Sequence, residues 1–174
     1  KKNLSVDELS EVHELVQDKT SKQERKMLDG ILEIGQTVVK QIMRNRTDII
    51  ALPSNSSFSD VRELILKSGH SRIPVYNNDL DTIIGIIYIK DLLPFLSVEN
   101  EKNINWKELI RQPFFVPENK KLDDLLAEFQ AKKIHLAIVI DEYGGTSGII
   151  TLEDIIEEIV GDIKNEFDND DLEY

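Results

Sequence analysis

The residues best suited to bind a small ligand lie near the end of the chain, at positions 148–154, Gly-Ile-Ile-Thr-Leu-Glu-Asp. A glycine at the end of a turn lets the backbone approach a ligand closely. Thr151 can cap a helix that begins at about Leu152, where an anion would meet free amides, the helix dipole and a hydroxyl group. Asp154, one turn into this helix, can accept hydrogen bonds from the vicinal hydroxyls of a ribose. From these residues alone, an ordinary helix start with an acidic first turn is the favoured interpretation.

A degraded copy of the same pattern occurs earlier in the chain. Asp91 precedes Asp154 by 63 residues, but Tyr88 stands at the position that corresponds to the capping hydroxyl of Thr151. The first copy therefore keeps the acidic acceptor and lacks the hydroxyl cap. We expect one good binding site, built with Thr151 and Asp154, and a second site at Asp91 that is weak or empty.

Both helix starts close a copy of an internal repeat, and each copy reads strand, helix, strand, turn, strand, helix. Pro53 matches Pro117 at an offset of 64, and Gly85 matches Gly148 at an offset of 63. Order, residue type and spacing agree over more than fifty residues. The main apolar segments are 58–65, 73–76 and 83–89 in the first copy and 122–129, 136–140 and 148–156 in the second. Two copies predict a pseudo-two-fold pair and not a solenoid, which needs three or more.

The predicted fold class is therefore α+β, with two β-α-β-β-α repeats related by a pseudo-two-fold and preceded by N-terminal helices. In each repeat the paired apolar strands form a hairpin, and the helices cover one face of a small sheet. Ser57 and Asp60 are the pair expected to open the long helix of the first repeat. The predicted boundaries are 1–38 for a helical lead-in, 39–98 and 99–163 for the two repeats, and 164–174 for an acidic linker or tail.

Residues 1–35 are predicted to form two helices. The first covers Asp7–Gln17, whose apolar residues fall on one stripe. The second begins near Ser21, which faces Glu24 as a capping pair. Its expected buried side consists of Met27, Leu28, Ile31, Leu32 and Ile34. Packing on the rest of the chain is the favoured role of this segment, ahead of any role in ligand binding.

Composition excludes several classes of function. The 174 residues include 21 basic and 33 acidic side chains, for a net charge of -12, which repels nucleic acid and anionic lipid. Local cations and helix N-termini can still bind a small anion against that field. The absence of cysteine removes disulfides, thiolate zinc sites and cysteine nucleophiles. No apolar run approaches the roughly 20 residues of a membrane span, and no signal peptide is visible, while a start without methionine suggests an excised piece.

Three further patterns resemble functional motifs without meeting their requirements. The glycine-rich stretch 144–148 joins two strands and lacks the lysine of a phosphate-binding loop, so a hairpin turn is expected. The acidic stretch 168–171 lacks the glycine and the terminal glutamate of a calcium loop, so a solvated tail is expected. The histidines and carboxylates show no zinc-ligand or nucleophile–base spacing. We therefore expect no catalytic residues, no bound metal and no enzyme activity.

The order of elements, ending in Gly-h-h-x-x-x-Asp, resembles the CBS domain, pairs of which form Bateman modules. Longer strings resemble the cytosolic module of the CorC/HlyC (hemolysin C-like, CNNM-related) family. These strings are SRIPVY at 71–76, IKDLL at 89–93, HLAIVIDEYGGT at 135–146 and GIITLEDIIEEIVG at 148–161. The resemblance covers about residues 5–167.

The resemblance implies an adenine nucleotide, ATP or AMP, with or without Mg²⁺ and with no prosthetic group. Asp154 would hold the ribose, Thr151 would lie on the phosphate side, and Arg72 or His135 could neutralise phosphate charge. The implied site residues are Thr151, Asp154, Ile149, His135, Arg72, Ser71, His70, Ile49 and Arg44. Arg44 departs from the family, which usually has Met-Thr-Pro here, and it either reaches phosphate or is simply solvated. For His70 and His135, a structural or surface role is equally favoured.

The resemblance also implies a regulatory module at the cytoplasmic face of the cell membrane. It would modulate an attached magnesium and cobalt transport protein, whose transmembrane domain and C-terminal domain would be its partners. A homodimer is expected through helices with surplus apolar surface, at Leu122, Leu125, Leu126 and Phe129. Two alternatives are a structural dimerisation domain without a ligand and a regulatory segment of a soluble enzyme.

Overall fold

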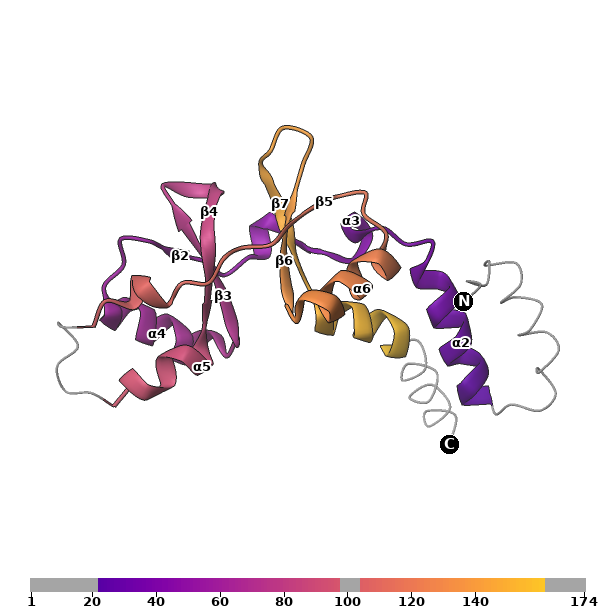
Figure 1. The fold of residues 1–174 in the computed structure, drawn as a ribbon, viewed down its shortest axis with the longest axis horizontal. Coiled ribbons are helices and arrows are strands. Elements are labelled where there is room, and N and C mark those ends of the chain that lie inside the picture. The colour runs from indigo at the N-terminus through magenta and orange to yellow at the C-terminus, as the bar shows by residue number, and fades with distance from the viewer. Residues whose placement is uncertain (1–21, 98–103, 162–174) are drawn as a thin grey trace. The chain divides into compact units, whose positions relative to one another are not determined.

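The computed structural model describes residues 22–97 and 104–161, and its elements follow the predicted order (Figure 1). The N-terminal helix Asp7–Gln17 and the Ser21–Glu24 capping pair lie outside the described residues. Two compact units are formed by different parts of the chain. The smaller unit contains the described residues 22–43, 119–135 and 150–161. The larger unit contains the described residues 44–97, 104–118 and 136–149.

Two sheets carry the strands of the larger unit. The three-stranded sheet has the order β2-β3-β4, where β2 (Leu52–Pro53) runs parallel and β4 (Asp79–Tyr88) antiparallel to β3 (Arg72–Asn77). The four-stranded sheet has the order β1-β7-β6-β5. Its strands are β1 (Arg44–Asn45), β5 (Phe115–Pro117), β6 (Leu136–Ile140) and β7 (Thr146–Thr151). The short strand β1 comes from the start of the first repeat and pairs antiparallel with β7 of the second.

Helix α4 (Phe58–Ser68) covers the three-stranded sheet, as the helical spacing of its apolar residues predicts (Figure 1). Ser57 Oγ accepts from Asp60 N at 3.1 Å, and Asp60 Oδ2 accepts from Ser57 N at 3.3 Å. These two bonds confirm the expected capping box. The helix ends at Gly69, whose φ of 68° is left-handed. Apolar side chains from helix, sheet and loops form one core, namely Leu52, Phe58, Val61, Ile65, Ile73, Val75, Ile87, Leu92 and Trp106.

Short helical elements link the larger segments of both repeats. The bounds are α3 (Val39–Ile42), η1 (Arg46–Asp48), α5 (Ile89–Leu92), η2 (Leu93–Phe95) and η4 (Trp106–Leu109). Trp106 Nε1 donates to the carbonyl of Ser56 at 2.9 Å, so the buried indole has a partner for its only donor. The helix that follows β7 is described for residues 152–161.

The other unit is helical, and its packing corrects two predictions. In α6 (Leu122–Lys132), Leu122, Leu125 and Phe129 are buried and Leu126 is half-buried. The three buried side chains are part of the core of the chain, so the surplus apolar surface expected on this helix is not there. The apolar stripe was identified correctly, but its partner is the chain itself.

The second correction concerns α2 (Lys22–Ile34), which presents Gly30 and Ile34 to the interior and leaves Met27 and Ile31 exposed. A Cβ atom at Gly30 would lie only 2.8 Å from the carbonyl oxygen of Ile159. The helix therefore packs closely on the backbone at Ile159 through its smallest residue. The expected buried side counted only large apolar side chains, and Leu28 and Leu32 are half-buried.

Two backbone segments of the larger unit approach closely at Gly85. Ile86 N donates to Arg111 O at 2.9 Å and Arg111 N donates to Ile86 O at 2.8 Å. A Cβ atom at Gly85 would lie 2.2 Å from Ile110 Cγ2 and 2.5 Å from Arg111 O. The glycine common to both repeats thus has a packing role here, because a backbone oxygen cannot move aside as a flexible side chain can.

We predict that Gly85→Ala destabilises the protein by about 1–3 kcal/mol, the usual cost of overpacking. Urea unfolding followed by circular dichroism measures this loss. Gly35→Ala is the matched control, because its Cβ would meet its nearest neighbour at an ordinary 3.5 Å. Equal stability of the two variants would contradict the close approach at Gly85.

Candidate functional site

The helix start of the second repeat is held by a reciprocal pair of bonds between Thr151 and Asp154. Asp154 N donates to Thr151 Oγ1 at 3.1 Å, and Thr151 N donates to Asp154 Oδ2 at 3.0 Å. This is a capping box, so the ordinary structural role anticipated for these residues is present. It uses one carboxylate oxygen, and Asp154 Oδ1 makes no hydrogen bond within the described part of the chain. Both residues are half-buried, which leaves them within reach of a ligand.

His135 belongs to the same helix start. Its carbonyl accepts a hydrogen bond from Leu152 N at 2.8 Å, and its Nδ1 lies 3.6 Å from Glu153 Oε1. The corresponding bond in the first repeat joins Ile89 N to the carbonyl of Ser71 at 3.0 Å. The two repeats therefore fix their closing helices by the same main-chain contact. His135 is therefore tied to this helix start through its backbone carbonyl.

The helix start of the first repeat has the same backbone and a different chemistry. Tyr88 makes no side-chain capping bond. Arg111 Nε and Nη2 donate to the two oxygens of Asp91 at 2.8 and 2.9 Å. The guanidinium carbon of Arg111 lies 4.1 Å from the centroid of the Tyr88 ring, a cation–π contact. The bonds from Arg111 lower the pKa of Asp91, and Asp91 in turn raises the pKa of Arg111.

Arg111 was missed by sequence reasoning, although a signal for it exists. Arg44 and Arg111 each follow the short helix that opens a repeat. Arg44 lies opposite Ile149 in the β1–β7 ladder, and Arg111 lies opposite Ile86 in an isolated bridge. Ile86 and Ile149 are 63 residues apart, so the two arginines are equivalent by register. Their spacing of 67 residues differs from the repeat offset, which hides the match in the sequence.

Ser71 and Arg72 line a pocket of about 320 Å³ together with Tyr88, Ile89, Lys90 and Leu93. The Arg72 guanidinium and the Lys90 ammonium each lie 5.6 Å from the Tyr88 ring centroid. Cations therefore gather around this ring. His70 is half-buried, its amide donates to Ser68 Oγ at 3.3 Å, and it does not line this pocket.

Arg44, Ile49 and Ile149 come together in the larger unit. Arg44 is exposed and pairs through its backbone with Ile149, and Ile49 packs on the cluster that contains Ile149. Ser71 and Arg72 belong to the same unit, while Thr151, Asp154 and His135 belong to the other. The residues implied by the resemblance thus form separate groups, each with its own local geometry.

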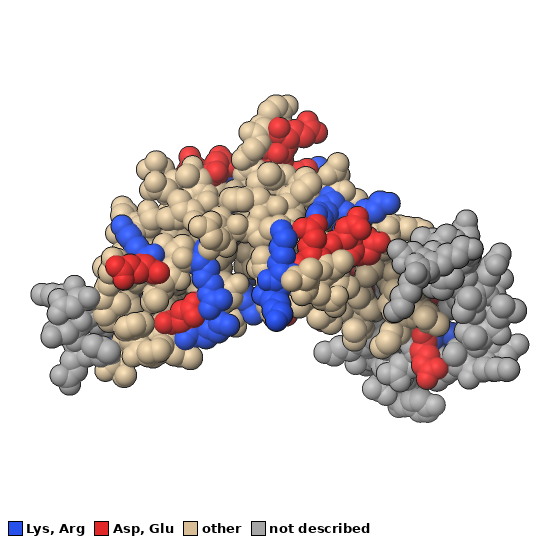
Figure 2. Space-filling model, in the orientation of Figure 1, with Lys and Arg blue, Asp and Glu red and all other residues tan. Residues whose placement is uncertain are grey.

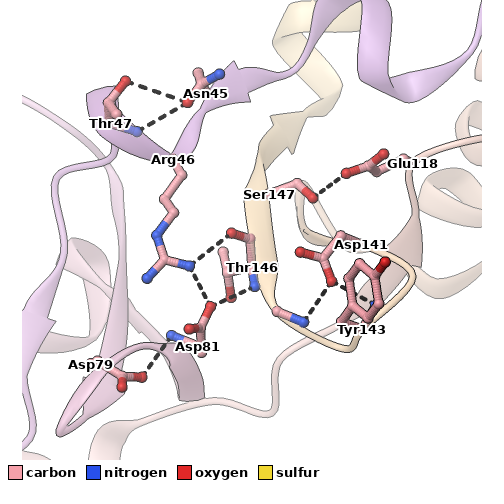
Figure 3. Close-up of polar contacts among 11 residues, drawn as sticks. Asn45, Arg46, Thr47, Asp79, Asp81, Glu118, Asp141, Tyr143, Thr146 and Ser147 are labelled. Carbon is pink, nitrogen blue, oxygen red and sulfur yellow. Dashed lines mark hydrogen bonds and ion pairs between the residues drawn. The ribbon is translucent and has the colours of Figure 1, made fainter.

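A polar network that the sequence did not suggest connects β4 to β7 (Figure 3). Asp81 Oδ1 accepts from Thr146 N at 3.0 Å and from Arg46 Nη1, which also donates to Thr146 O at 3.2 Å. Asp141 Oδ1 accepts from Tyr143 N and Gly145 N, both at 2.9 Å, and so shapes the expected hairpin turn. The Arg46 bond is the main cause that lowers the pKa of Asp81, and the Thr146 amide adds to it.

The net charge does not make the surface uniformly acidic. On the face drawn in Figure 2, Lys and Arg side chains form groups beside Asp and Glu. Local cations of this kind allow an anion to bind to a chain with a charge of -12. Within the described residues, no three His, Asp or Glu side chains are grouped as metal ligands.

Known proteins resemble this chain in sequence and in fold. The family model described as CBS domain matches residues 39–98 and 106–161. "Hemolysin C" of Brachyspira hyodysenteriae is 41% identical over 150 residues, which are 86% of this chain and 54% of that protein. "Magnesium and cobalt efflux protein CorC" of Escherichia coli K12 is 44% identical over 147 residues, 84% of this chain and 50% of that one. The chain therefore spans about half the length of these relatives.

Solved structures give the same result. The CBS domain of a bacterial CNNM/CorC family Mg²⁺ transporter in complex with an inhibitor is 38% identical, with a TM-score of 0.84 over 90% of this chain and 98% of that one. A structure of such a CBS domain in complex with ATP is 42% identical, with a TM-score of 0.76 over 80% and 98%. A CBS-domain pair with bound AMP from Klebsiella pneumoniae is 30% identical, with a TM-score of 0.64 over 71% and 98%. The α+β fold class of two CBS-type repeats is confirmed.

We predict that Asp81→Asn lowers stability at neutral pH and that the deficit shrinks in acid. A carboxylate whose pKa is lowered by folding stabilises the folded state above its ordinary pKa, near 4, and loses this effect as pH falls through the folded value. Urea midpoints at pH 7 and pH 3 measure the difference. Glu63→Gln, which removes an exposed carboxylate from α4, controls for the change in net charge. A deficit that does not depend on pH would contradict the ion pair with Arg46.

Proposed function

Because this chain is a tandem pair of CBS domains of the CorC/hemolysin C family, we propose that it is a regulatory module that binds an adenine nucleotide, ATP or AMP. The nucleotide would bind at the helix start of the second repeat and bias an attached transport protein through the module's conformation. The module would bind its ligand and not convert it, so it would not be an enzyme.

The observation that carries this proposal is the intact helix start at Thr151 and Asp154. The capping box fixes the Asp154 carboxylate and leaves Oδ1 without a bond to the described residues. A carboxylate oxygen held in this way suits the vicinal hydroxyls of a ribose, and the positive end of the helix dipole favours a phosphate placed nearby. The ATP complex of a CBS domain 42% identical to this chain supports the choice of ligand.

The remaining residues implied by the resemblance are assigned by their chemistry to other parts of the nucleotide. We assign Ile49 and Ile149, which belong to one apolar cluster, to the flat faces of the base. Arg44, Arg72 and His135 would neutralise phosphate charge, and an ATP ligand would bring Mg²⁺ on its phosphates. Ser71 and His70 would contribute polar contacts. These roles are proposals that rest on residue chemistry.

The chain would act as part of a larger protein. Its curated relatives named as CorC are about twice as long as the region they share with it. Within the described residues, no helix is both long enough and apolar enough to cross a bilayer. We propose that the complete protein adds a transmembrane domain for magnesium or cobalt transport and a C-terminal domain, with this module at the cytoplasmic face of the membrane.

A homodimer would form through the closing helices of the two repeats. Leu93 and Ile156 are 63 residues apart and so take the same position in each repeat. They are 57% and 47% exposed, which is unusual for large apolar side chains that share a repeat position. Isologous contacts between two copies would bury them.

One observation favours the alternative of a dimerisation domain without a ligand. The capping box already gives Thr151 and Asp154 a structural task, so their presence does not require a nucleotide. The two functions differ in their response to titration with ATP and AMP, because a purely structural domain would bind neither.

We predict an asymmetry between the two acidic positions in calorimetric titration with ATP and AMP. Asp154→Ala should weaken binding by roughly tenfold or more, since a hydrogen bond to a charged group is worth about 1.5–3 kcal/mol. Thr151→Val removes a neutral hydroxyl and should cost about 1 kcal/mol. Asp91→Ala should leave the main binding event nearly intact. Equal losses at Asp91 and Asp154 would contradict a single main site.

Asp60→Ala is the matched control for the lost cap. Asp60 makes the same two capping bonds with Ser57 as Asp154 makes with Thr151. Losing either cap costs about 1 kcal/mol of stability. If Asp60→Ala weakened nucleotide binding as much as Asp154→Ala, the effect would be one of stability alone, and the proposed ribose contact would be wrong.

We predict a dimer, of twice the 20.0 kDa chain mass, in sedimentation experiments at high micromolar concentration. Leu93→Arg combined with Ile156→Arg should give a monomer, because charged side chains cannot be buried there without a partner. Leu66→Arg is the control, since Leu66 is 70% exposed on α4 and does not lie on a closing helix. A wild-type monomer, with and without ATP, would exclude this interface.

A further inference from the structure

Arg111 makes the contacts at the first repeat that a nucleotide would make at the second. Its two nitrogens bond both oxygens of Asp91, at 2.8 and 2.9 Å, and Asp91 is the counterpart of Asp154. Its planar guanidinium lies over the Tyr88 ring at 4.1 Å. The acidic acceptor and the flat face next to it are therefore both engaged by the chain itself.

The main chain fixes Arg111 in this place. The paired bonds between Ile86 and Arg111 are 2.9 and 2.8 Å long, and Gly85 allows this approach because it has no Cβ. Only the side chain has to be ordered for the guanidinium to reach Asp91, five residues after Ile86. The Asp91 side chain is 23% exposed and that of Arg111 is 45% exposed, so water competes only in part.

The equivalent arginine at the second repeat does not behave in this way. Arg44 has the same register opposite Ile149 as Arg111 has opposite Ile86. Its side chain is exposed and makes no ion pair or hydrogen bond with the described residues. Asp154 instead uses one oxygen for its capping box. The repeats thus share a backbone and an arginine, and only the first uses that arginine to neutralise its acidic residue.

We infer that Arg111 determines how many nucleotides the chain binds, because it closes the first repeat and confines binding to the second. A nucleotide at the first repeat would have to displace two charge-assisted bonds from Asp91, and neutral ribose hydroxyls are poor substitutes for a bidentate guanidinium. It would also meet no hydroxyl cap, since Tyr88 replaces one. This inference rests on the proposed function and adds a residue that controls the stoichiometry.

The test is calorimetric titration of the whole chain with ATP and Mg²⁺, repeated with AMP. Three variants are compared. Arg111→Met keeps the approximate length of the side chain and removes its charge, and Arg111→Lys keeps the charge and loses the bidentate geometry. Asp154→Ala removes the proposed ribose acceptor of the second repeat. Wild type should bind one nucleotide per chain. Arg111→Met should add a second, weaker nucleotide-binding event. This second event should persist in the Arg111→Met, Asp154→Ala double variant and disappear in the Arg111→Met, Asp91→Ala double variant. Arg111→Lys should weaken this second event at least several-fold relative to Arg111→Met.

Lys67→Met is the control, because it removes one positive charge from an exposed pair with Glu63. It should leave the stoichiometry at one. Two equivalent sites in the wild type, or no binding by the Arg111→Met, Asp154→Ala double variant, would overturn the role of Arg111. If wild type binds nothing but Arg111→Met binds one nucleotide, Arg111 closes the first repeat and the proposed site at Asp154 is wrong. No binding by any variant would overturn both proposals.

Discussion

The two main-chain hydrogen bonds between Ile86 and Arg111 are the constraint on which the chemistry of the first repeat depends. They pair the last strand of that repeat with the opening segment of the second. The pairing requires glycine at position 85, because any Cβ there would collide with the Arg111 backbone. It also brings the Arg111 side chain to Asp91 and Tyr88. A packing requirement and an electrostatic one therefore share a single backbone contact.

The two repeats show how similar backbones can differ in chemistry. Each closing helix begins with an amide that donates to the residue just before a strand of its own repeat, from Ile89 to Ser71 and from Leu152 to His135. A threonine at position 151 then gives a self-contained cap with Asp154, whereas a tyrosine at position 88 gives no cap and leaves Asp91 to an arginine. One substitution at the capping position thus changes which partner the acidic residue takes, and with it whether that residue remains available to a ligand.

Much of the fold follows from local patterns, and less of the site does. The capping pair Ser57–Asp60 was predictable because both partners lie within one turn of helix. The burial of Phe58, Val61 and Ile65 follows from helical spacing. Patterns of this kind do not say what covers an apolar stripe, so the stripe of α6 was mistaken for an interface. They also count only large apolar side chains as buried, so they did not predict that α2 packs through Gly30.

Contacts between distant segments could not be predicted from the sequence for a related reason. Arg46, Asp81 and Thr146 are separated by 35 and 65 residues, and each is unremarkable in its own surroundings. Only the sheet pairing that brings β4 and β7 to the same region joins them into one network. The contact between Arg111 and Asp91 likewise depends on the bridge between Ile86 and Arg111. Arg111 lies 67 residues after Arg44, which does not match the offset of the repeat, so the sequence hides their equivalence.

Preorganisation gives the capping box of the second repeat a meaning beyond stability. A carboxylate that is free to rotate must be ordered when a ligand binds, and that ordering opposes binding. Asp154 is already held by the Thr151 amide through Oδ2, so a ligand that bonds to Oδ1 would meet an acceptor with a fixed direction. The Asp91 carboxylate is equally well ordered, but by a cation that satisfies both of its oxygens. An ordered carboxylate therefore favours ligand binding only where the group that orders it leaves one carboxylate oxygen available.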